Sequence, residues 1–205
     1  MEVPMRHRKA TILAALTAGL LLLGACSSSS DDGGSGSSST IPASAKFNAT
    51  DVGYAQGMIP HHAQAIEMAG LAPDRSTNAE VLALAAAIEA AQGPEIAELQ
   101  GWLRDWGQKV PPADADHDMS EYPSMSMTGM LSDADMDRLA AAEGTEFDRL
   151  FLESMILHHE GAVEMAEEEV ADGKASETTG QAERVIRDQT AEIAEIEDIL
   201  AGLPA

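Results

Sequence analysis

The sequence predicts an all-α protein in which four amphipathic helices form a bundle. Three observations support this fold class. Aromatic residues make up only 3% of the 205-residue chain, β-branched runs are absent, and the strong helix formers Ala, Leu, Glu and Met dominate. Apolar residues recur at helical spacing in four segments. A twelve-residue motif occurs twice, which indicates that one helical pair has been duplicated.

The repeat joins Met58–Ala69 to Met155–Ala166. Eight of the twelve positions are identical at a constant offset of 97 residues. The same offset, without a gap, pairs Gln92–Leu99 with Gln189–Ile196. Each copy therefore contains two helices, and pseudo-two-fold symmetry is expected to bring the two copies of the motif together in a four-helix bundle.

The first helical pair is expected before residue 107. Its first helix should run from about Thr50 to Leu71, with Thr50 or Asp51 as the cap, and Pro60 should cause a kink or a late helix start. The second helix should run from Ser76–Asn78 to about Trp106, interrupted at Gly93–Pro94. Its inward residues are predicted to be Ile88, Ile96, Leu99, Trp102 and Leu103.

The second pair follows an insertion, about residues 107–131, that is rich in Pro, Asp and Met and is predicted to be a loop. A short helix should begin at the cap Ser132 and end at Gly144. The third long helix should then run from Thr145 to Gly173, and the fourth from about Ser176 to Ala201 with Gly202 as its cap. The inner stripe of the third helix is predicted to contain Phe147, Leu150, Phe151, Met155, His158, His159, Ala162, Met165 and Ala166.

The N-terminus indicates export. Residues 1–25 combine a basic start with a short apolar run, and they precede Cys26, the only cysteine of the chain. This pattern is typical of a bacterial lipoprotein signal peptide, in which Cys26 becomes the lipidated first residue, carrying acyl chains such as palmitate. Residues 26–45 would form a flexible Ser/Gly linker to the domain of residues 46–205. We expect the protein at the outer face of the cell membrane or in the periplasm; an ordinary signal peptide is the alternative.

The net charge of −23 argues against nucleic acid as a partner and against electrostatic binding to anionic lipid, because both would be repelled. The expected partners are a metal ion and the membrane, the latter through the lipid anchor. A single cysteine also excludes an internal disulfide, so the domain must be stabilised by its own core.

Histidine and methionine occupy positions where a buried helix usually carries Leu or Ile. In each copy the two histidines and two methionines share one face of the helix, which is costly unless the imidazoles have partners. The candidate metal ligands are His61, His62, His158, His159, Met58, Met155, Met68 and Met165. The alternative is a hydrogen-bonded polar core that specifies helix pairing.

Polar residues in the second helix of each pair are candidate supporting groups. Gln92, Glu95, Gln189 and Glu192 could accept the outer N–H of a ligating imidazole and orient it, or they could lie at the helix edge in water. The insertion offers possible auxiliary metal ligands, with an ordinary low-complexity loop as the alternative. These are His117, Met119, Met125, Met127 and Met130.

The spacing favours copper, particularly Cu(I). Di-iron bundles carry Glu-x-x-His, whereas here Met58 and Met155 stand three residues before the first histidine of each pair. A soft thioether in place of a carboxylate oxygen favours copper over iron or manganese, and thioether sulfur is a poor ligand for zinc.

The doubled motif Met-Ile-x-His-His-x-x-Ala-(Ile/Val)-Glu-Met-Ala, with Gln-x-x-Glu-Ile in the second helix of each pair, resembles the family catalogued as domain of unknown function 305. The resemblance covers about residues 47–200. It implies an exported, ferritin-like four-helix bundle, and because some members are associated with copper binding and copper tolerance, it implies the same His and Met residues as ligands.

The sequence therefore favours an extracytoplasmic metal-binding lipoprotein that sequesters copper without catalysis. A metal-dependent redox enzyme, such as a cuprous oxidase on the same bundle, is the first alternative. A structural or interaction module with a polar histidine core is the second.

Overall fold

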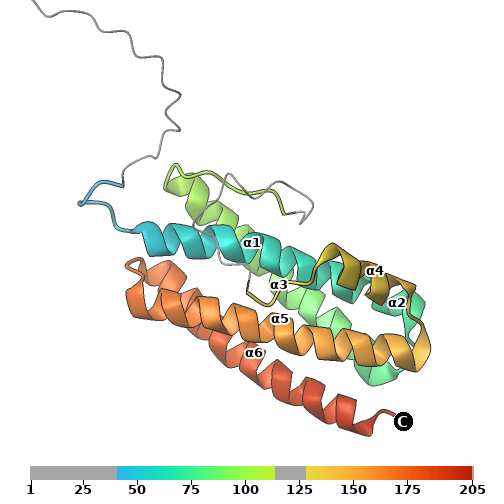
Figure 1. The fold of residues 1–205 in the computed structure, drawn as a ribbon. Coiled ribbons are helices and arrows are strands. Elements are labelled where there is room, and N and C mark those ends of the chain that lie inside the picture. Colours follow the sequence, from blue (N-terminus) through green and yellow to red (C-terminus); the bar gives the residue numbers. More distant parts are fainter. Residues whose placement is uncertain (1–40, 114–127, 205) are drawn as a thin grey trace, which may run out of the picture. The chain divides into compact units, whose positions relative to one another are not determined.

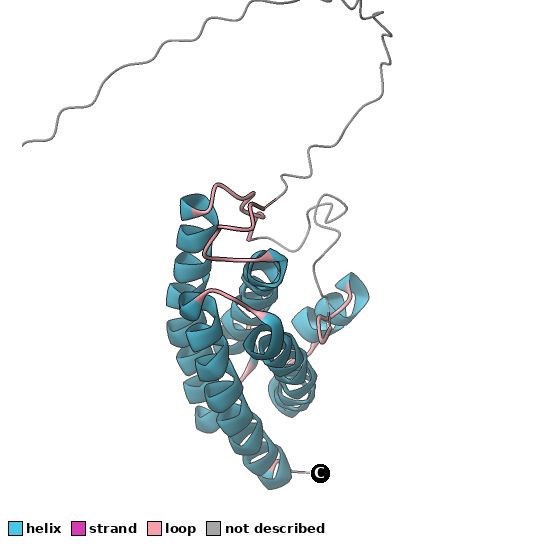
Figure 2. Cartoon of the chain, turned by 90° about the vertical axis from the view of Figure 1, so that its left-hand side faces the viewer, coloured by secondary structure: helices cyan, strands magenta, loops and turns pink. Residues whose placement is uncertain are grey.

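The computed structural model describes residues 41–113 and 128–204, and all the regular structure in these ranges is helical (Figures 1 and 2). Several predicted features lie outside the described residues: the signal peptide, Cys26, most of the linker, and His117, Met119, Met125 and Met127 of the insertion. No helix in the described part is both long and apolar enough to cross a bilayer.

Four long helices form two antiparallel hairpins. The first hairpin consists of α1 (Ala49–Gly70) and α3 (Ala79–Asp105), joined through the single turn α2 (Ala72–Arg75). The second consists of α5 (Gly144–Asp172) and α6 (Ser176–Gly202), preceded by the short helix α4 (Asp133–Ala141). The hairpins pack together mainly through α1 and α5, which lie side by side (Figure 1). This is the four-helix bundle that the duplication predicts.

The start of α1 differs from the predicted one. Asn48 is the N-cap: its side chain accepts from the backbone N–H of Asp51, whose carboxylate in turn accepts from the backbone N–H of Asn48. This reciprocal capping box satisfies two N–H groups at once, whereas neither Thr50 nor Asp51 occupies the cap position. The predicted late start before His61 is also wrong, because α1 continues through Pro60.

The predicted interruption of the second long helix is wrong as well. Helix α3 continues through Gly93 and Pro94 to Asp105. A proline removes one backbone hydrogen bond, to the carbonyl four residues earlier. Here both Pro94 and Ala90 are exposed, so water can reach the carbonyl that loses its partner. Ile88, Leu99 and Leu103 are buried as predicted, and Ile96 and Trp102 are half-buried against the core.

Helix α4 begins after Ser132, whose side chain accepts from the backbone N–H of Asp135, as the sequence predicts. Its end is not at Gly144, however. The helix stops at Ala141, and Gly144 is the first residue of α5, with a φ of +59° that a residue with a side chain rarely adopts. Helix α6 ends one residue beyond the predicted Ala201, and Leu203 is its C-cap.

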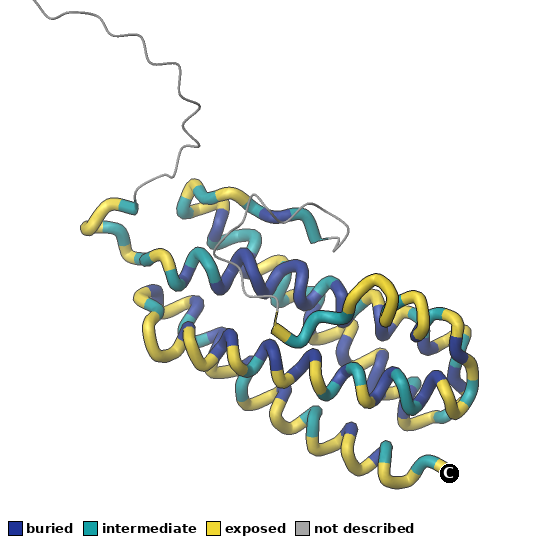
Figure 3. The backbone as a smooth tube through the Cα atoms, in the orientation of Figure 1, coloured by how far each residue is buried: buried dark blue, intermediate teal, exposed yellow. Residues whose placement is uncertain are grey.

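The core consists of two apolar clusters at opposite ends of the α1–α5 interface. One contains Met68 of α1 with Phe147, Phe151 and Met155 of α5. The other contains Tyr54, Met58 and Ile59 of α1 with Ala162 and Met165 of α5. Figure 3 shows the buried positions recurring along each long helix while the exposed ones follow the outer sides. Burying each large apolar side chain stabilises the fold by about 1.5–3 kcal/mol. The two histidine pairs interrupt this apolar interface between the clusters.

Candidate metal centre

Four buried imidazoles form a layer across the middle of the α1–α5 interface. His61 and His62 come from α1, His158 and His159 from α5, and each is at most 1% exposed. The rings of His61 and His158 face each other, with centroids 3.8 Å apart and planes inclined by 42°. The structure therefore brings the two copies of the motif together, as the pseudo-symmetry of the sequence predicts.

In three of the four rings, an oxygen atom lies within hydrogen-bond distance of Nε2. His62 Nε2 lies 2.7 Å from Glu95 Oε2, and His159 Nε2 lies 2.8 Å from Glu192 Oε2. His61 Nε2 lies 3.0 Å from the backbone carbonyl oxygen of Thr128. Because a carboxylate or a carbonyl oxygen can only accept, each of these rings carries its proton on Nε2 when it is neutral.

The opposite nitrogens are buried without a hydrogen-bond partner among the described residues. These atoms are Nδ1 of all four histidines and, in His158 alone, Nε2 as well. A buried polar atom without a partner costs about 1–3 kcal/mol. An unprotonated imidazole nitrogen that is kept dry and unpaired is the form of histidine that binds a metal ion.

The rings of His61 and His158 are held neutral. Burial, helped by the neighbouring imidazole of His62, lowers the pKa of His61 to about 3. Burial likewise holds the pKa of His158 well below the usual value, with the adjacent rings of His61 and His159 acting in the same direction. Low dielectric disfavours an imidazolium. Both rings are consequently available as ligands at neutral pH.

The four predicted methionines flank the histidine layer on both sides. Met58 and Met165 belong to one apolar cluster, Met68 and Met155 to the other. Three of them are fully buried, and Met165 is 6% exposed. A thioether therefore lies one helical turn from a histidine pair on each side of the layer, because Met58 precedes His61 by three residues and Met155 precedes His158 by three.

The glutamines of the second helices are buried one turn before the two glutamates. Gln92 and Gln189 are 2% and 4% exposed. Neither atom of the Gln92 amide has a partner in the described chain, nor does Oε1 of Gln189. Glu95 and Glu192 are half-buried and reach the histidines directly, whereas no hydrogen bond joins either glutamine to an imidazole. The role of all four toward a bound ion stays a prediction.

The donor atoms around the histidine layer suit a soft metal ion better than a hard one. In residues 41–113 and 128–204, no three His, Cys, Asp or Glu side chains are grouped closely enough to hold one ion by themselves. A metal site here therefore needs thioether sulfur, rotation of a ring on binding, or both. Carboxylates are present only behind His62 and His159, so the donors that face the interface are nitrogen and sulfur, which suit copper.

The end of the insertion also reaches the site. Thr128–Leu131 passes over the α1–α5 interface, and its first residue supplies the carbonyl that His61 contacts. Met130, a predicted auxiliary ligand, lies in this segment and lines a surface cavity of about 560 Å³ with Leu157 of α5. No histidine lines this cavity. No sequence signal identifies Thr128, because a backbone carbonyl is common to every residue.

A second group of polar residues, which sequence reasoning missed, lies where α1 meets the α5–α6 turn. Asp51 Oδ1 accepts from the backbone N–H groups of Lys174 and Ala175 and from the Thr178 hydroxyl, each at 2.9 Å. Burial alone would raise the pKa of Asp51, but the backbone hydrogen bonds, led by that of Ala175, outweigh burial and hold the pKa below its usual value. Asp51 thus ties the two hairpins together as a carboxylate.

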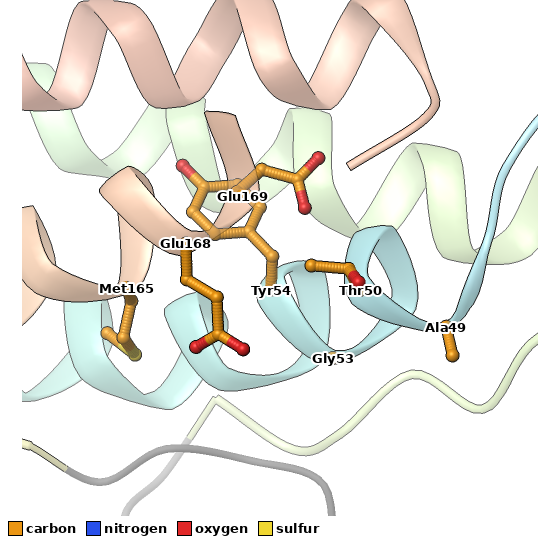
Figure 4. Close-up of a pocket in the computed structure, with 7 residues that line it drawn as sticks. All are labelled: Ala49, Thr50, Gly53, Tyr54, Met165, Glu168 and Glu169. Carbon is orange, nitrogen blue, oxygen red and sulfur yellow. The ribbon is translucent and has the colours of Figure 1, made fainter. Parts of the chain in front are cut away.

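Glu169 lies nearby and behaves differently. It is fully buried, and its carboxyl group interacts with the side chains of Thr178 and Asp51. Burial, helped by the neighbouring carboxylate of Asp51 and opposed by the hydroxyl of Thr178, raises the pKa of Glu169 to about 8. Glu169 lines a cavity of about 240 Å³ with Tyr54 and Met165 (Figure 4). Met165 lies at one end of this cavity and Ala49 at the other.

The fold and the site together define a class of protein: a four-helix bundle made of two similar hairpins, with paired histidines and methionines buried where the hairpins meet. Residues 51–200 match the model of the family described as domain of unknown function, DUF305. The chain belongs to this family.

Solved structures of the same family share the fold. A DUF305 protein from Streptomyces coelicolor, described as secreted, is 33% identical with a TM-score of 0.66, over 75% of this chain and 91% of its own. A DUF305 fragment from Deinococcus radiodurans is 29% identical with a TM-score of 0.65, over 76% and 98%. CopM in its Cu(I)-bound form is 30% identical with a TM-score of 0.61, over 76% and 98%. CopM has also been solved with Cu(II) and with silver. Among curated proteins, no match to this chain is found.

Proposed function

We propose that this protein is an exported copper-binding lipoprotein that sequesters the metal in the histidine layer between α1 and α5. The observation that carries the proposal is the set of five buried imidazole nitrogens without a hydrogen-bond partner among the described residues. The ligands would be His61, His62, His158 and His159, with sulfur from Met58, Met155, Met68 or Met165.

The choice of copper over zinc or iron rests on the donors. Imidazole binds all three metals, but thioether sulfur binds Cu(I) well and zinc poorly. No carboxylate faces the interface beside the histidine layer, so the hard donors of a di-iron bundle are missing there. The structures of CopM with Cu(I), Cu(II) and silver support this choice, since CopM shares about 30% of the sequence and the fold.

Sequestration is favoured over catalysis by the burial of the site. All four imidazoles are at most 1% exposed, and a fully enclosed site suits the retention of an ion more than repeated turnover. A cuprous oxidase on the same bundle would show oxygen consumption with excess Cu(I). A purely structural histidine core would show no tight copper binding at all.

The proposed location at the membrane rests on the N-terminal sequence, which lies outside the described residues. Lipidation at Cys26 would anchor the bundle at the outer face of the membrane, at the end of a Ser/Gly linker. Cys26→Ser should release the protein from the membrane fraction or leave it unprocessed. Normal cleavage with unchanged membrane retention would contradict the anchor.

The decisive experiment is a competition assay between the bundle and a chromophoric Cu(I) chelator. Replacing His61, His62, His158 and His159 together by Leu keeps a helix-forming residue of similar size at each position. Copper binding should be lost while circular dichroism still reports a helical fold. The matched variant replaces Met119, Met125, Met127 and Met130 by Leu and should bind as the parent does. If the four-His variant binds as tightly as the parent and the loop variant does not, the insertion is the site.

A further inference from the structure

Residues Thr128–Leu131, here called the strap, are fixed to α1 by three hydrogen bonds. Thr128 O accepts from His61 Nε2 at 3.0 Å. Gln64 Nε2 donates to Leu131 O at 3.0 Å, and Gln64 Oε1 accepts from Leu131 N at 2.8 Å. The amide of Gln64, which is buried, thus pairs with both backbone groups of Leu131. Two parallel hydrogen bonds between one amide and one backbone residue fix both the position and the direction of the strap.

On the α5 side the strap is held by close backbone packing. A Cβ atom at Gly161 would lie 2.1 Å from Thr128 O and 2.8 Å from Gly129 Cα. A Cβ atom at Gly129, whose φ is +82°, would lie 2.6 Å from Leu157 O. Neither contact leaves room for a side chain, so both glycines are needed for the strap to lie on α5.

Gln64 and Gly161 occupy the same position in the two copies of the repeat, 97 residues apart. It is one of the four positions in the twelve-residue motif where the copies differ. Both residues meet the strap, Gln64 by hydrogen bonds and Gly161 by having no side chain. The difference between the copies therefore has a structural reason: one strap crosses a nearly symmetric interface and needs a different contact from each side.

The strap makes the two facing histidines unequal. His62 and His159 each have a glutamate on Nε2. His61 has the Thr128 carbonyl instead, while the equivalent ring of His158 has no partner on either nitrogen in the described chain. One ring of the pair is held in a single tautomer, and the other is not.

We propose that Gln64 and Gly161 are positioning residues of the histidine layer: by seating the strap, they hold His61 as the Nε2–H tautomer and keep its Nδ1 atom for the ion. Neither residue touches the ion. The proposal rests on the proposed copper site for its functional meaning, but the tautomer of His61 can be measured without metal, so the two ideas can fail separately.

The first test uses metal-free protein with 15N-labelled histidine. In the parent, NMR should show His61, His62 and His159 as fixed Nε2–H tautomers. Gln64→Leu removes both hydrogen bonds to Leu131, and Gly161→Ala puts a methyl group where Thr128 O lies. In each variant the His61 nitrogens should shift toward averaged values, while those of His62 and His159 stay unchanged. Gly101→Ala in α3, where a Cβ atom meets nothing within 4 Å, is the matched control.

The second test measures Cu(I) affinity in the same variants. Loss of a supporting contact behind a ligating histidine lowers metal affinity by about 10- to 100-fold. Each single variant should show such a loss of Cu(I) affinity. The double variant should lose no more affinity than the single variant with the larger loss, because both changes act through one strap. Circular dichroism keeps unfolding separate from these effects, and if Gly161→Ala does not fold, Gln64→Leu alone decides.

Three results would overturn the inference. The first is a fixed Nε2–H tautomer of His61 in a folded Gln64→Leu variant. The second is a shifted tautomer with unchanged Cu(I) affinity, which would leave the strap without a role in binding. The third is a double variant whose loss is the product of the single losses, which would mean that the two residues act independently. If the parent binds no copper, the proposed function fails while the tautomer result still stands.

Discussion

His61 and His158 face each other across the two hairpins with ring centroids 3.8 Å apart. Two imidazolium ions at this distance in a buried interface would repel each other strongly. The contact therefore excludes a state in which both rings are charged, and burial lowers the pKa of each ring so that both are neutral. A bundle that needed only apolar packing would place Leu or Ile at these positions. In the proposed function, the unpaired nitrogens of these two neutral rings are the donors for the copper ion.

Met58→Leu combined with Met155→Leu tests the role of sulfur. Both side chains are fully buried, and Leu has nearly the same volume, so the free energy of unfolding should fall by less than about 1.5 kcal/mol for each substitution. Cu(I) affinity should fall more than Cu(II) affinity, because the thioether is the softer donor. Parallel titrations with the two oxidation states measure this.

Met136→Leu is the control for this pair, since Met136 packs against the same core from α4 but lies outside the repeated motif. It should change neither affinity. Equal losses of Cu(I) and Cu(II) binding in the double variant would contradict sulfur ligation.

Glu95→Gln and Glu192→Gln test the groups behind the histidines. Each change keeps the shape and removes the charge that accepts from His62 or His159. Because an amide can turn either its oxygen or its NH₂ group to the ring, the tautomer is no longer enforced. Copper affinity should fall by about 10- to 100-fold in each variant. Competition against a chelator measures the loss.

Glu98→Gln provides a matched comparison. It lies on the same helix as Glu95 but pairs with Arg184 at the surface, at 3.0 Å. Copper affinity should not change in this variant. A comparable loss there would show that the general negative charge, and not the contact with histidine, is responsible.

The fold can be predicted from the sequence because the duplication is visible there. The repeat of Met58–Ala69 at Met155–Ala166 implies two similar hairpins, and their symmetric packing places His61 against His158. Apart from the N-cap of α1, the errors in the helix bounds concern prolines and glycines. Pro94 was predicted to interrupt a helix that continues through it, because local propensity does not show that the freed carbonyl of Ala90 lies at the surface.

The site is only partly predictable. The ligand candidates share one helix face, so periodicity finds them, whereas the contacts across helices depend on packing. The strap could not be predicted, because it contacts His61 through a backbone carbonyl, which every residue has. The difference between Gln64 and Gly161 was visible in the repeat, but it has meaning only once Thr128–Leu131 is seen between them. The sequence offers Asp51 only as an alternative to Thr50 for the helix cap, because its contacts with the α5–α6 turn are long-range.

Glu169→Gln tests the neutral acid at the end of the bundle. The pKa of Glu169 is raised from 4.5 to about 8 in the folded protein. The folded state therefore holds a proton that the unfolded state has lost, and this contribution to stability, complete below pH 4.5, disappears as the pH rises through about 8. Stability of the parent should fall from pH 7 to pH 9, and that of the Gln variant should fall less.

Urea denaturation across this pH range measures the difference. Glu167→Gln, at an exposed position of the same helix, is the control and should follow the parent. Identical pH dependence in the parent and the Glu169→Gln variant would mean that folding does not raise the pKa of Glu169.

His61→Asn tests the histidine layer by its effect on acid stability. The pKa of His61 is lowered from 6.5 to about 3 in the folded, metal-free protein. Between these values the unfolded state binds a proton that the folded state does not, so the stability contributed by neutral His61 is complete above pH 6.5 and is lost as the pH falls. One such group changes the free energy of unfolding by about 1.4 kcal/mol per pH unit. The parent curve should therefore be steeper than that of the variant by roughly this amount between pH 6 and pH 4, and taking the difference of two urea series cancels the carboxylates common to both proteins. Saturating copper should shift the acid loss of the parent to lower pH, because an ion on Nδ1 competes with the proton. Parallel curves for parent and variant would show that folding does not lower the pKa of His61, which would contradict a ring that burial keeps neutral.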